Sequence, residues 1–583
     1  MDRQAWIAVT LCVLGLVGWQ VYSLQHPAPR MPARVAASAT PGATATTSAS
    51  PAGTTAAASP APNEPAPTLT PTPATFAEQT AGLQNSDLQL RLTNRGGAIA
   101  EATLLQQKDA NGKPLHLNAA ARVPIGALIE KPASPELAEY QIVPANKGSV
   151  QFQRALPGGV TLRKTFTLPV PPNEKDNYVA HLEVAFQNDG TAAYTNPGFF
   201  LTLGSASPIH PNDLPNYTRI TWCLDGKAKY TDVSWFGVQT YPFIGKEKRP
   251  AMQFFDEPLA NAEWVGVSNQ FFVTLITPLT HPATHVWATR FEAGKKPNGE
   301  PDYGISGALG LPGFVLKPGQ AETLKFQLYL GPKLYHRLAQ LTHDEAEIMD
   351  FGLWKLVSQA LLNMMNLIHG FVGNYAVAIL ILTAIIKLLL WPLQTKANKS
   401  MRRMSALSPK MQELREKFKD DPTKMNAEVM KLYKDYGVNP VSGCLPMLIQ
   451  IPIFFGLFTM LRQAVELRNA SFLWVHDLSQ PDTVAHIPGL GWPINILPLI
   501  MAATNVWLMR LTPKSGDATQ QRVMMFMPLI FVVFCYNFAA ALALYYTTQN
   551  LFTILQLYQN RNQPLPTLEK VNQPGRRKGK GRS

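Results

Sequence analysis

The sequence predicts a polytopic α-helical membrane protein with about six spans, a large all-β sandwich on one side of the membrane and a helical hairpin on the other. Three observations carry this prediction. Several long apolar runs follow residue 370, each of a length that suits a membrane span. Short alternating runs separated by turn residues fill residues 76–345. Basic residues concentrate in residues 394–440, between two of the apolar runs.

The positive charge of this 583-residue chain is unevenly distributed. The formal net charge of +13 concentrates between Lys396 and Lys434 and in the C-terminal tail, residues 561–583. Such basic patches suit anionic lipid or RNA. Three of the four cysteines lie in apolar runs, a distribution that predicts neither a disulfide framework nor a metal site.

The first 75 residues predict an anchor and a tether. Residues 1–25 contain an apolar run flanked by Trp6 and Trp19, which suit the membrane interface. The run is long for a cleaved signal peptide, and no small-residue cleavage site directly follows it, so we expect a retained signal anchor. Residues 26–75 are mostly Pro, Ala, Thr and Ser, which cannot bury enough apolar surface to fold, and should form a disordered linker.

The alternating runs of residues 76–345 predict the β-sandwich. Representative runs are 88–92, 160–168 and 323–330. The domain contains no phosphate-binding loop, HExxH or nucleophile-elbow pattern, so the sequence predicts no enzyme and no cofactor. Trp235 and Trp264 are candidates for a ligand groove, although core packing is the commoner role of such residues.

Residues 350–370 predict an amphipathic helix lying at the membrane interface. Its polar residues recur at spacings of four and three and are Lys355, Gln359, Asn363, Asn366 and His369. Its apolar residues fall outside that stripe. A helix in a soluble core is the alternative, but the position directly before a spanning segment favours the interface.

Five further spans follow. They cover residues 372–393, 443–462, 492–511, 522–538 and 541–560. The loop of residues 463–490 is far less basic than residues 394–440. By the positive-inside rule, residues 394–440 and both termini are cytoplasmic, and the β domain is periplasmic. The expected location is therefore the inner membrane of a Gram-negative bacterium.

Residues 394–440 predict the cytoplasmic helical hairpin. Apolar residues recur on one face of each helix and include Met401, Met404, Met411, Leu414, Met425 and Val429. Asp421 and Pro422 are typical of a helix start, and Gly437 is typical of a helix end. A solvated helix face accounts for much of the charge in this segment.

Lys387 lies well inside the second half of the 372–393 span, where a cation costs a few kcal/mol. Two interpretations have equal weight on position alone. The lysine can extend its ammonium toward the headgroups near Trp391 and Pro392. Alternatively, it faces a wet cavity inside a helix bundle.

Polar side chains in other spans bear on that choice, because they are costly unless they share one wet space. They are Thr383, Gln450, Asn505, Thr548, Gln549 and Asn550.

A set of short motifs gives the chain a specific resemblance. They are Ile368-His369-Gly370-Phe371, Trp391-Pro392-Leu393, Val438-Asn439-Pro440, Gly443-Cys444-Leu445-Pro446, Gln450-Ile451-Pro452, Glu466-Leu467-Arg468, Trp474-Val475-His476-Asp477, Phe526-Met527-Pro528 and Leu544-Tyr545-Tyr546. On these residues the chain resembles the YidC/Oxa/Alb family of membrane-protein insertases, in its Gram-negative form, over essentially the whole length.

This resemblance implies an insertase without enzymatic activity, built around a hydrophilic groove. Lys387 matches the basic groove residue that attracts acidic substrate segments. Groove residues would be Lys387, Thr383, Gln450, Asn505, Tyr545, Tyr546, Thr548 and Gln549. The substrate's apolar segment would leave along the third and fifth spans, over Cys444, Ile449, Phe454, Met527 and Phe531.

The resemblance also implies partners. The hairpin would capture nascent membrane proteins, the basic tail would contact ribosomes, and insertion would proceed alone or with the Sec translocon. Anionic lipids are expected partners of the basic segments, and DNA is not.

Two features depart from the family pattern. The family usually has arginine where this chain has Lys387, and a Pro and a Gly in the turn that here reads 538–542. A secondary transporter, or another protein of envelope biogenesis, is the alternative. A transporter predicts internal repeats and acidic residues inside the spans, and the sequence contains neither.

Overall fold

The computed structural model describes residues 76–561 apart from 110, 121–122, 134, 170–176, 212, 242–244, 297–298, 420, 439–444, 489–490, 513–529 and 531. The chain divides into two compact units, one of residues 68–516 and 538–583, the other of residues 1–67 and 517–537. The predicted anchor, the linker, the basic tail after residue 561 and most of the predicted 522–538 span therefore lie outside the described residues.

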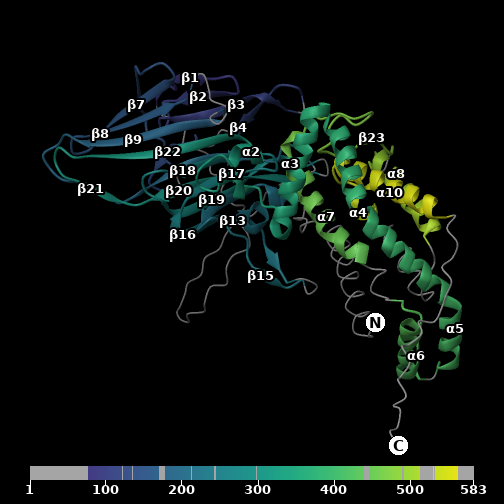
Figure 1. The fold of residues 1–583 in the computed structure, drawn as a ribbon. Coiled ribbons are helices and arrows are strands. Elements are labelled where there is room, and N and C mark those ends of the chain that lie inside the picture. The colour runs from purple at the N-terminus through teal and green to yellow at the C-terminus, as the bar shows by residue number, and fades with distance from the viewer. Residues whose placement is uncertain are drawn as a thin grey trace, which may run out of the picture. The chain divides into compact units, whose positions relative to one another are not determined.

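Two antiparallel sheets form the layers of the β domain (Figure 1). The nine-stranded sheet runs in the order β13 (Lys227–Asp232), β12 (Arg219–Leu224), β17 (Trp264–Ser268), β18 (Phe272–Pro278), β22 (Ala321–Pro332), β9 (Val179–Asn188), β8 (Val160–Thr167), β7 (Ser149–Leu156) and β6 (Gln141–Val143). The five-stranded sheet runs β16 (Phe254–Ala262), β19 (Ala283–Lys295), β20 (Pro301–Leu311), β11 (Phe199–Ala206) and β5 (Leu128–Ile129). A separate four-stranded sheet contains β1 (Thr80–Gln84), β2 (Leu88–Thr93), β3 (Ala98–Lys108) and β4 (Pro114–Leu117).

The two larger sheets pack face to face, with β11 against β17 and β18, and β20 against β12 and β17. The alternation along β8 explains the packing, because Val160, Leu162 and Phe166 are buried on one face. Lys164 shares that face and is also fully buried. Its Nζ donates to the carbonyls of Gly96 and Gly126, and burial lowers its pKa well below the ordinary value. The β-sandwich prediction is confirmed.

The two tryptophans proposed for a ligand groove differ in their surroundings. Trp264 is fully buried in β17, and its Nε1 donates to the carbonyl of His343 at 2.9 Å. It is therefore a core residue. Trp235 is partly exposed and packs edge-on against the rings of Phe236 and Phe255.

The described residues after the β domain form seven longer helices, which Figure 1 labels. They are α3 (Lys355–Val372), α4 (Tyr375–Ala406), α5 (Ser408–Lys417), α6 (Pro422–Asp435), α7 (Leu445–Gln463), α8 (Ile496–Leu511) and α10 (Ala540–Arg561). Helix α10 contacts both α4 and α8, while α3 contacts α4 and α7. A short ribbon of β23 (Thr483–His486) and β24 (Pro493–Asn495) precedes α8.

Helix α4 is longer than the predicted span, because it continues through Pro392 to Ala406. At about 1.5 Å per residue its 32 residues reach about 48 Å, beyond a hydrocarbon core of about 30 Å. The span and the start of the predicted hairpin thus form one helix, which ends where α5 begins with a proline in its first turn. By length and composition, α4 is the one described helix that qualifies as a membrane span, and α8 is a shorter apolar helix.

The ends of α6 agree with the sequence prediction. The Asp421 side chain accepts a hydrogen bond from the Lys424 amide at 3.0 Å, which satisfies a free N–H of the first turn. After the last helical residue, Gly437 has φ +60°, a conformation that favours glycine. Helices α5 and α6 contact each other, and Lys410 bonds the Tyr436 hydroxyl.

Helix α3 turns Ser358, Leu361, Leu362, Met365 and Ile368 inward. Several large apolar side chains are exposed on this helix or just before it, namely Leu353, Leu356, Leu367 and Phe371. The outward face of α3 therefore mixes apolar side chains with part of the polar stripe, a composition that suits a boundary between water and lipid.

Candidate functional site

Lys387 lies on the side of α4 that packs against α10. Its side chain is only 4% exposed, and its Nζ donates a hydrogen bond to Thr553 Oγ1 of α10 at 2.8 Å. The ammonium therefore points into the seam between the two helices. An intramembrane cation placed in this way marks a candidate functional site.

A second polar contact crosses from α8 to α10. Asn550 Nδ2 lies 3.1 Å from both Thr504 Oγ1 and Asn505 Oδ1, and all three side chains are buried. Hydrogen bonds of this kind hold neighbouring membrane helices together. Asn505, predicted as a groove residue, therefore takes part in a contact between helices.

A third polar contact joins α10 to the extension of α4. Gln556 Nε2 donates to Thr395 Oγ1 at 3.2 Å, and Gln556 is 1% exposed. The Thr395 hydroxyl in turn donates to the Trp391 carbonyl of its own helix at 2.9 Å. Together the three contacts form a polar seam along α10. Asn550 makes its contact with α8, and Thr553 and Gln556 make theirs with α4, so the last two define the α4–α10 seam.

Other predicted groove residues bond within their own helices. Thr383 donates to the Ile379 carbonyl and Thr548 to the Leu544 carbonyl, each at 2.7 Å. Threonine in a helix commonly satisfies its hydroxyl in this way. The structure thus brings Lys387 and Asn505 into side-chain contacts with α10. Among the described residues it shows no side-chain hydrogen bond to another helix for Thr383, or for Thr548, which belongs to α10 itself.

An aromatic cluster lies beside the predicted exit path. Tyr545 is almost fully buried, and its hydroxyl has no hydrogen-bond partner among the described residues. Gln450 lies near that hydroxyl. The ring of Tyr546 meets that of Phe454 edge-on at 5.5 Å. Cys444, Met527, Phe531 and the side chain of Ile449 lie outside the described residues. Gln549 is partly exposed, and its backbone carbonyl accepts a hydrogen bond from the Thr553 hydroxyl.

In the predicted capture hairpin, part of the apolar face is buried between α5 and α6. Met411 is buried, and its sulfur accepts a hydrogen bond from the Tyr433 hydroxyl at 3.3 Å. The other predicted contact residues are partly exposed and are Met401, Met404, Leu414, Met425 and Val429. Met430 is more exposed than any of them.

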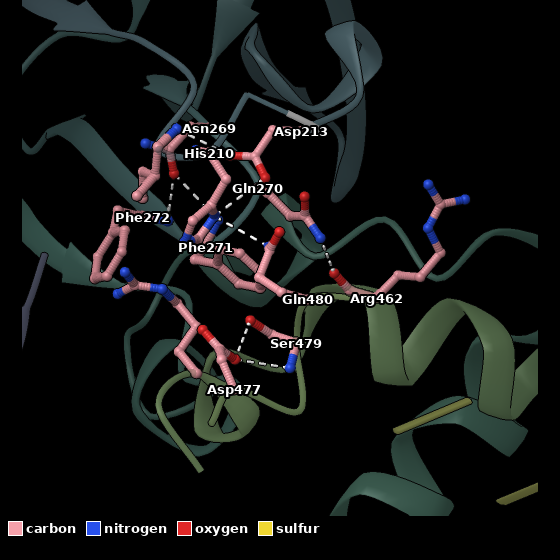
Figure 2. A network of polar contacts seen from close by, with 12 residues as sticks. His210, Asp213, Asn269, Gln270, Phe271, Phe272, Arg462, Asp477, Ser479 and Gln480 are labelled. Atoms are coloured by element: carbon pink, nitrogen blue, oxygen red, sulfur yellow. Dashed lines mark hydrogen bonds and ion pairs between the residues drawn. The ribbon is translucent and has the colours of Figure 1, made fainter. Parts of the chain in front are cut away.

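The segment after α7 connects the helices to the β domain (Figure 2). Gln270 donates to the Arg462 carbonyl at 2.7 Å, and Gln480 lies 3.1 Å from His210 Nδ1. The Arg468 guanidinium packs over the rings of Phe271 and Phe272. These contacts join residues that are separated by 192 to 270 positions in the chain. No local sequence pattern predicts them.

The same segment also orders the start of α10. The backbone N–H groups of Ala540 and Ala541 donate to the carbonyls of Gln480 and Leu478, at 2.8 and 3.0 Å. The first N–H groups of a helix lack partners within the helix, so these bonds satisfy two of them. The turn that departs from the family pattern is thus held by the loop it faces.

Glu466, just after α7, is paired with Asn366 of α3. Asn366 Nδ2 donates to Glu466 Oε1 at 3.2 Å. Glu466 Oε2 and Asn366 Oδ1 are both enclosed and have no hydrogen-bond partner among the described residues. Burial raises the pKa of Glu466, partly offset by bonds from its own backbone and from Asn366.

Sequence reasoning missed Thr553, Gln556, Thr395 and Thr504. A signal for two of them exists, because Asn550, Thr553 and Gln556 recur every third residue along α10, close to one helical face. The described residues contain no group of three or more His, Cys, Asp or Glu side chains placed to hold a metal ion.

A β-sandwich joined to apolar helices with a buried polar seam defines a membrane protein with a large extramembrane domain. Comparison with known families gives the same class. Residues 367–565 match the model of the 60Kd inner membrane protein, and residues 81–364 match that of the YidC periplasmic domain.

Curated relatives cover almost the whole chain. Membrane protein insertase YidC of Syntrophus aciditrophicus is 30% identical over 96% of this chain and 99% of its own length. That of Geobacter sulfurreducens is 31% identical over 96% and 98%. A solved structure of an active YidC insertase, with its first transmembrane domain resolved, covers 85% of this chain and 95% of its own at 18% identity, with a TM-score of 0.35. The chain belongs to the YidC family of inner membrane insertases.

Proposed function

We propose that this protein inserts other membrane proteins into the bacterial inner membrane and does so without catalysing a covalent reaction. The observation that carries the proposal is Lys387, a cation buried in the polar seam between α4 and α10. The curated relatives are named membrane protein insertases, and their names support the same activity for this chain.

The seam lowers the cost of moving a polar segment through the membrane. A carboxylate in hydrocarbon is strongly disfavoured, whereas one that meets Lys387 and neighbouring hydroxyl and amide groups keeps part of its solvation. The groove would be lined by the predicted residues Lys387, Thr383, Gln450, Asn505, Tyr545, Tyr546, Thr548 and Gln549. Contacts from Thr553 and Asn550 support this placement at α10.

The apolar segment of the substrate then leaves the groove sideways into lipid. Its path follows the third and fifth spans, over Cys444, Ile449, Phe454, Met527 and Phe531. The partly exposed rings of Phe454 and Tyr546 support this direction for α7 and α10. Apolar contacts of this kind accept many sequences, since they require no specific hydrogen-bond partner.

The remaining parts of the chain have roles in delivery. We propose six spans, with both termini and the α5–α6 hairpin in the cytoplasm and the β domain in the periplasm. The hairpin captures nascent chains with its partly exposed Met and Leu side chains. The basic tail binds ribosomes, anionic lipids bind the basic segments, and larger substrates are handled with the Sec translocon.

Crosslinking tests the position of the substrate. Full-length variants with a single cysteine at Gln450 or Met527, in a chain otherwise free of cysteine, are mixed with a ribosome-stalled, single-span substrate. We expect crosslinks at both positions, and none at a cysteine replacing the exposed Val315 of the β domain. Crosslinks confined to the β domain would contradict the groove.

A further inference from the structure

The Thr553 hydroxyl has two partners that together fix its role. It donates its proton to the Gln549 carbonyl, one turn earlier in α10, at 2.8 Å. It accepts a hydrogen bond from Lys387 Nζ, also at 2.8 Å. A hydroxyl has one proton and two lone pairs, so only its lone pairs face α4. Toward the seam Thr553 is therefore an acceptor, suited to a cation and not to a carboxylate.

This arrangement distinguishes Thr553 from other threonines in the same helices. Thr548 and Thr383 also donate to a carbonyl four residues earlier. Neither accepts a hydrogen bond from a side chain of another helix among the residues that the structure describes. Thr547 of the same helix is also buried, and its hydroxyl has no hydrogen-bond partner among the described residues. It is not one of the proposed groove residues, so it provides a matched control.

The ammonium of Lys387 can lie in the seam or near the Trp391-Pro392 segment, and the hydrogen bond to Thr553 favours the seam. Its butyl chain is flexible, and the Trp391-Pro392 segment lies only four to five residues further along α4. A lysine without a partner in the seam would gain solvation by extending toward that end. The charge-assisted bond to Thr553 offsets this tendency and keeps the ammonium in the seam.

We propose that Thr553 is a positioning residue, which holds the Lys387 ammonium in the α4–α10 seam where the carboxylates of an acidic substrate segment meet it. An ammonium has three N–H donors, and Thr553 occupies one. The other two have no acceptor among the described residues and remain available to a carboxylate. This proposal rests on the proposed function and assigns it a residue that does not itself carry charge.

The test uses full-length protein in liposomes and two forms of one single-span substrate. One form has Asp and Glu in its translocated N-terminal segment, and the other has Asn and Gln at the same positions. We expect Thr553→Val to lower insertion of the acidic form about tenfold, the loss typical of one charge-assisted hydrogen bond, and to leave the amide form unchanged. Thr553→Ser should restore insertion of the acidic form, and Thr547→Val should change neither.

A merely structural role for Thr553 predicts a different pattern, in which the valine variant lowers both substrate forms equally and serine gives no selective rescue. That pattern, or an unchanged acidic form, would overturn the proposal. Thr553→Ala, which removes the hydroxyl without adding bulk, serves if the valine variant does not fold.

A double variant separates this proposal from the function beneath it. In a Lys387→Ala background, Thr553→Val should cause no further loss, because the ammonium it positions is absent. If Lys387→Ala itself does not discriminate the two substrate forms, the electrostatic part of the proposed function fails. If it does, and Thr553→Val does not, only the role of Thr553 fails.

Discussion

Replacing Lys387 by alanine is expected to reduce insertion of substrates with acidic N-terminal segments by a factor of about ten or more. Two opposite charges 4 Å apart attract by about 4 kcal/mol at an effective dielectric constant of 20, and about 1.4 kcal/mol already corresponds to tenfold. Lys387→Arg should remain functional, since it keeps the charge and can still donate to Thr553. The measurement is complementation of cells depleted of their own insertase, followed by protease protection of the two substrate forms.

The matched control for this prediction is Lys396→Ala. Lys396 belongs to the same helix, but it is exposed and lies beyond Pro392. Its removal lowers the net charge by the same amount and should leave insertion unchanged. An alanine variant at Lys387 that complements fully and inserts acidic substrates normally would contradict the electrostatic role.

Glu466→Gln is expected to stabilise the protein at neutral pH by about 1–3 kcal/mol, the usual cost of a buried polar group without a partner. In the wild-type pair, Glu466 Oε2 and Asn366 Oδ1 both need a proton donor. A glutamine amide supplies that donor at every pH and still accepts a bond from Asn366. The measurement is the thermal unfolding temperature of the full-length protein in detergent, from pH 4 to 8.

The pH dependence follows from the direction of the pKa shift. Burial raises the pKa of Glu466 in the folded state above the ordinary carboxyl value of 4.5. The folded state therefore binds this proton more tightly than the unfolded state. The stability contributed by protonated Glu466 is fully present below about pH 4.5 and is lost as the pH rises through the folded-state pKa. The advantage of the glutamine variant should thus grow with pH over that window.

Glu413→Gln is the control for this experiment, because Glu413 is an exposed residue of α5 and the substitution changes the net charge equally. It should shift the unfolding temperature little at any pH. A Glu466→Gln variant that unfolds at or below the wild-type temperature at pH 7 would show that the carboxylate is well solvated in the folded protein.

The β-sandwich was predictable from the sequence because short runs such as residues 160–168 have alternating apolar residues. The structure shows the matching alternation of burial along β8. The sequence did not predict the strand order, in which β22 lies between β18 and β9, since pairing of distant strands leaves no local pattern. The junction of Arg468 with Phe271 and Phe272 was missed for the same reason.

The candidate site was only partly predictable. Asn505 and Lys387 stood out as polar residues in apolar runs, and both contact α10. Thr383 and Thr548 stood out equally, yet each bonds its own backbone, because a threonine hydroxyl in a helix can satisfy itself. The direction of the Lys387 side chain depends on Thr553, its partner in another helix. The position of Lys387 in its own span gives no information about that partner.

Insertion by the purified protein alone tests the central claim most directly. Full-length protein is reconstituted into liposomes, and a single-span substrate with an acidic N-terminal segment is synthesised in their presence. The predicted result is a protease-protected substrate fragment that is absent from empty liposomes and reduced by Lys387→Ala. Equal protection in empty liposomes, or protection unaffected by the alanine variant, would contradict an insertase that works through a cation in the α4–α10 seam.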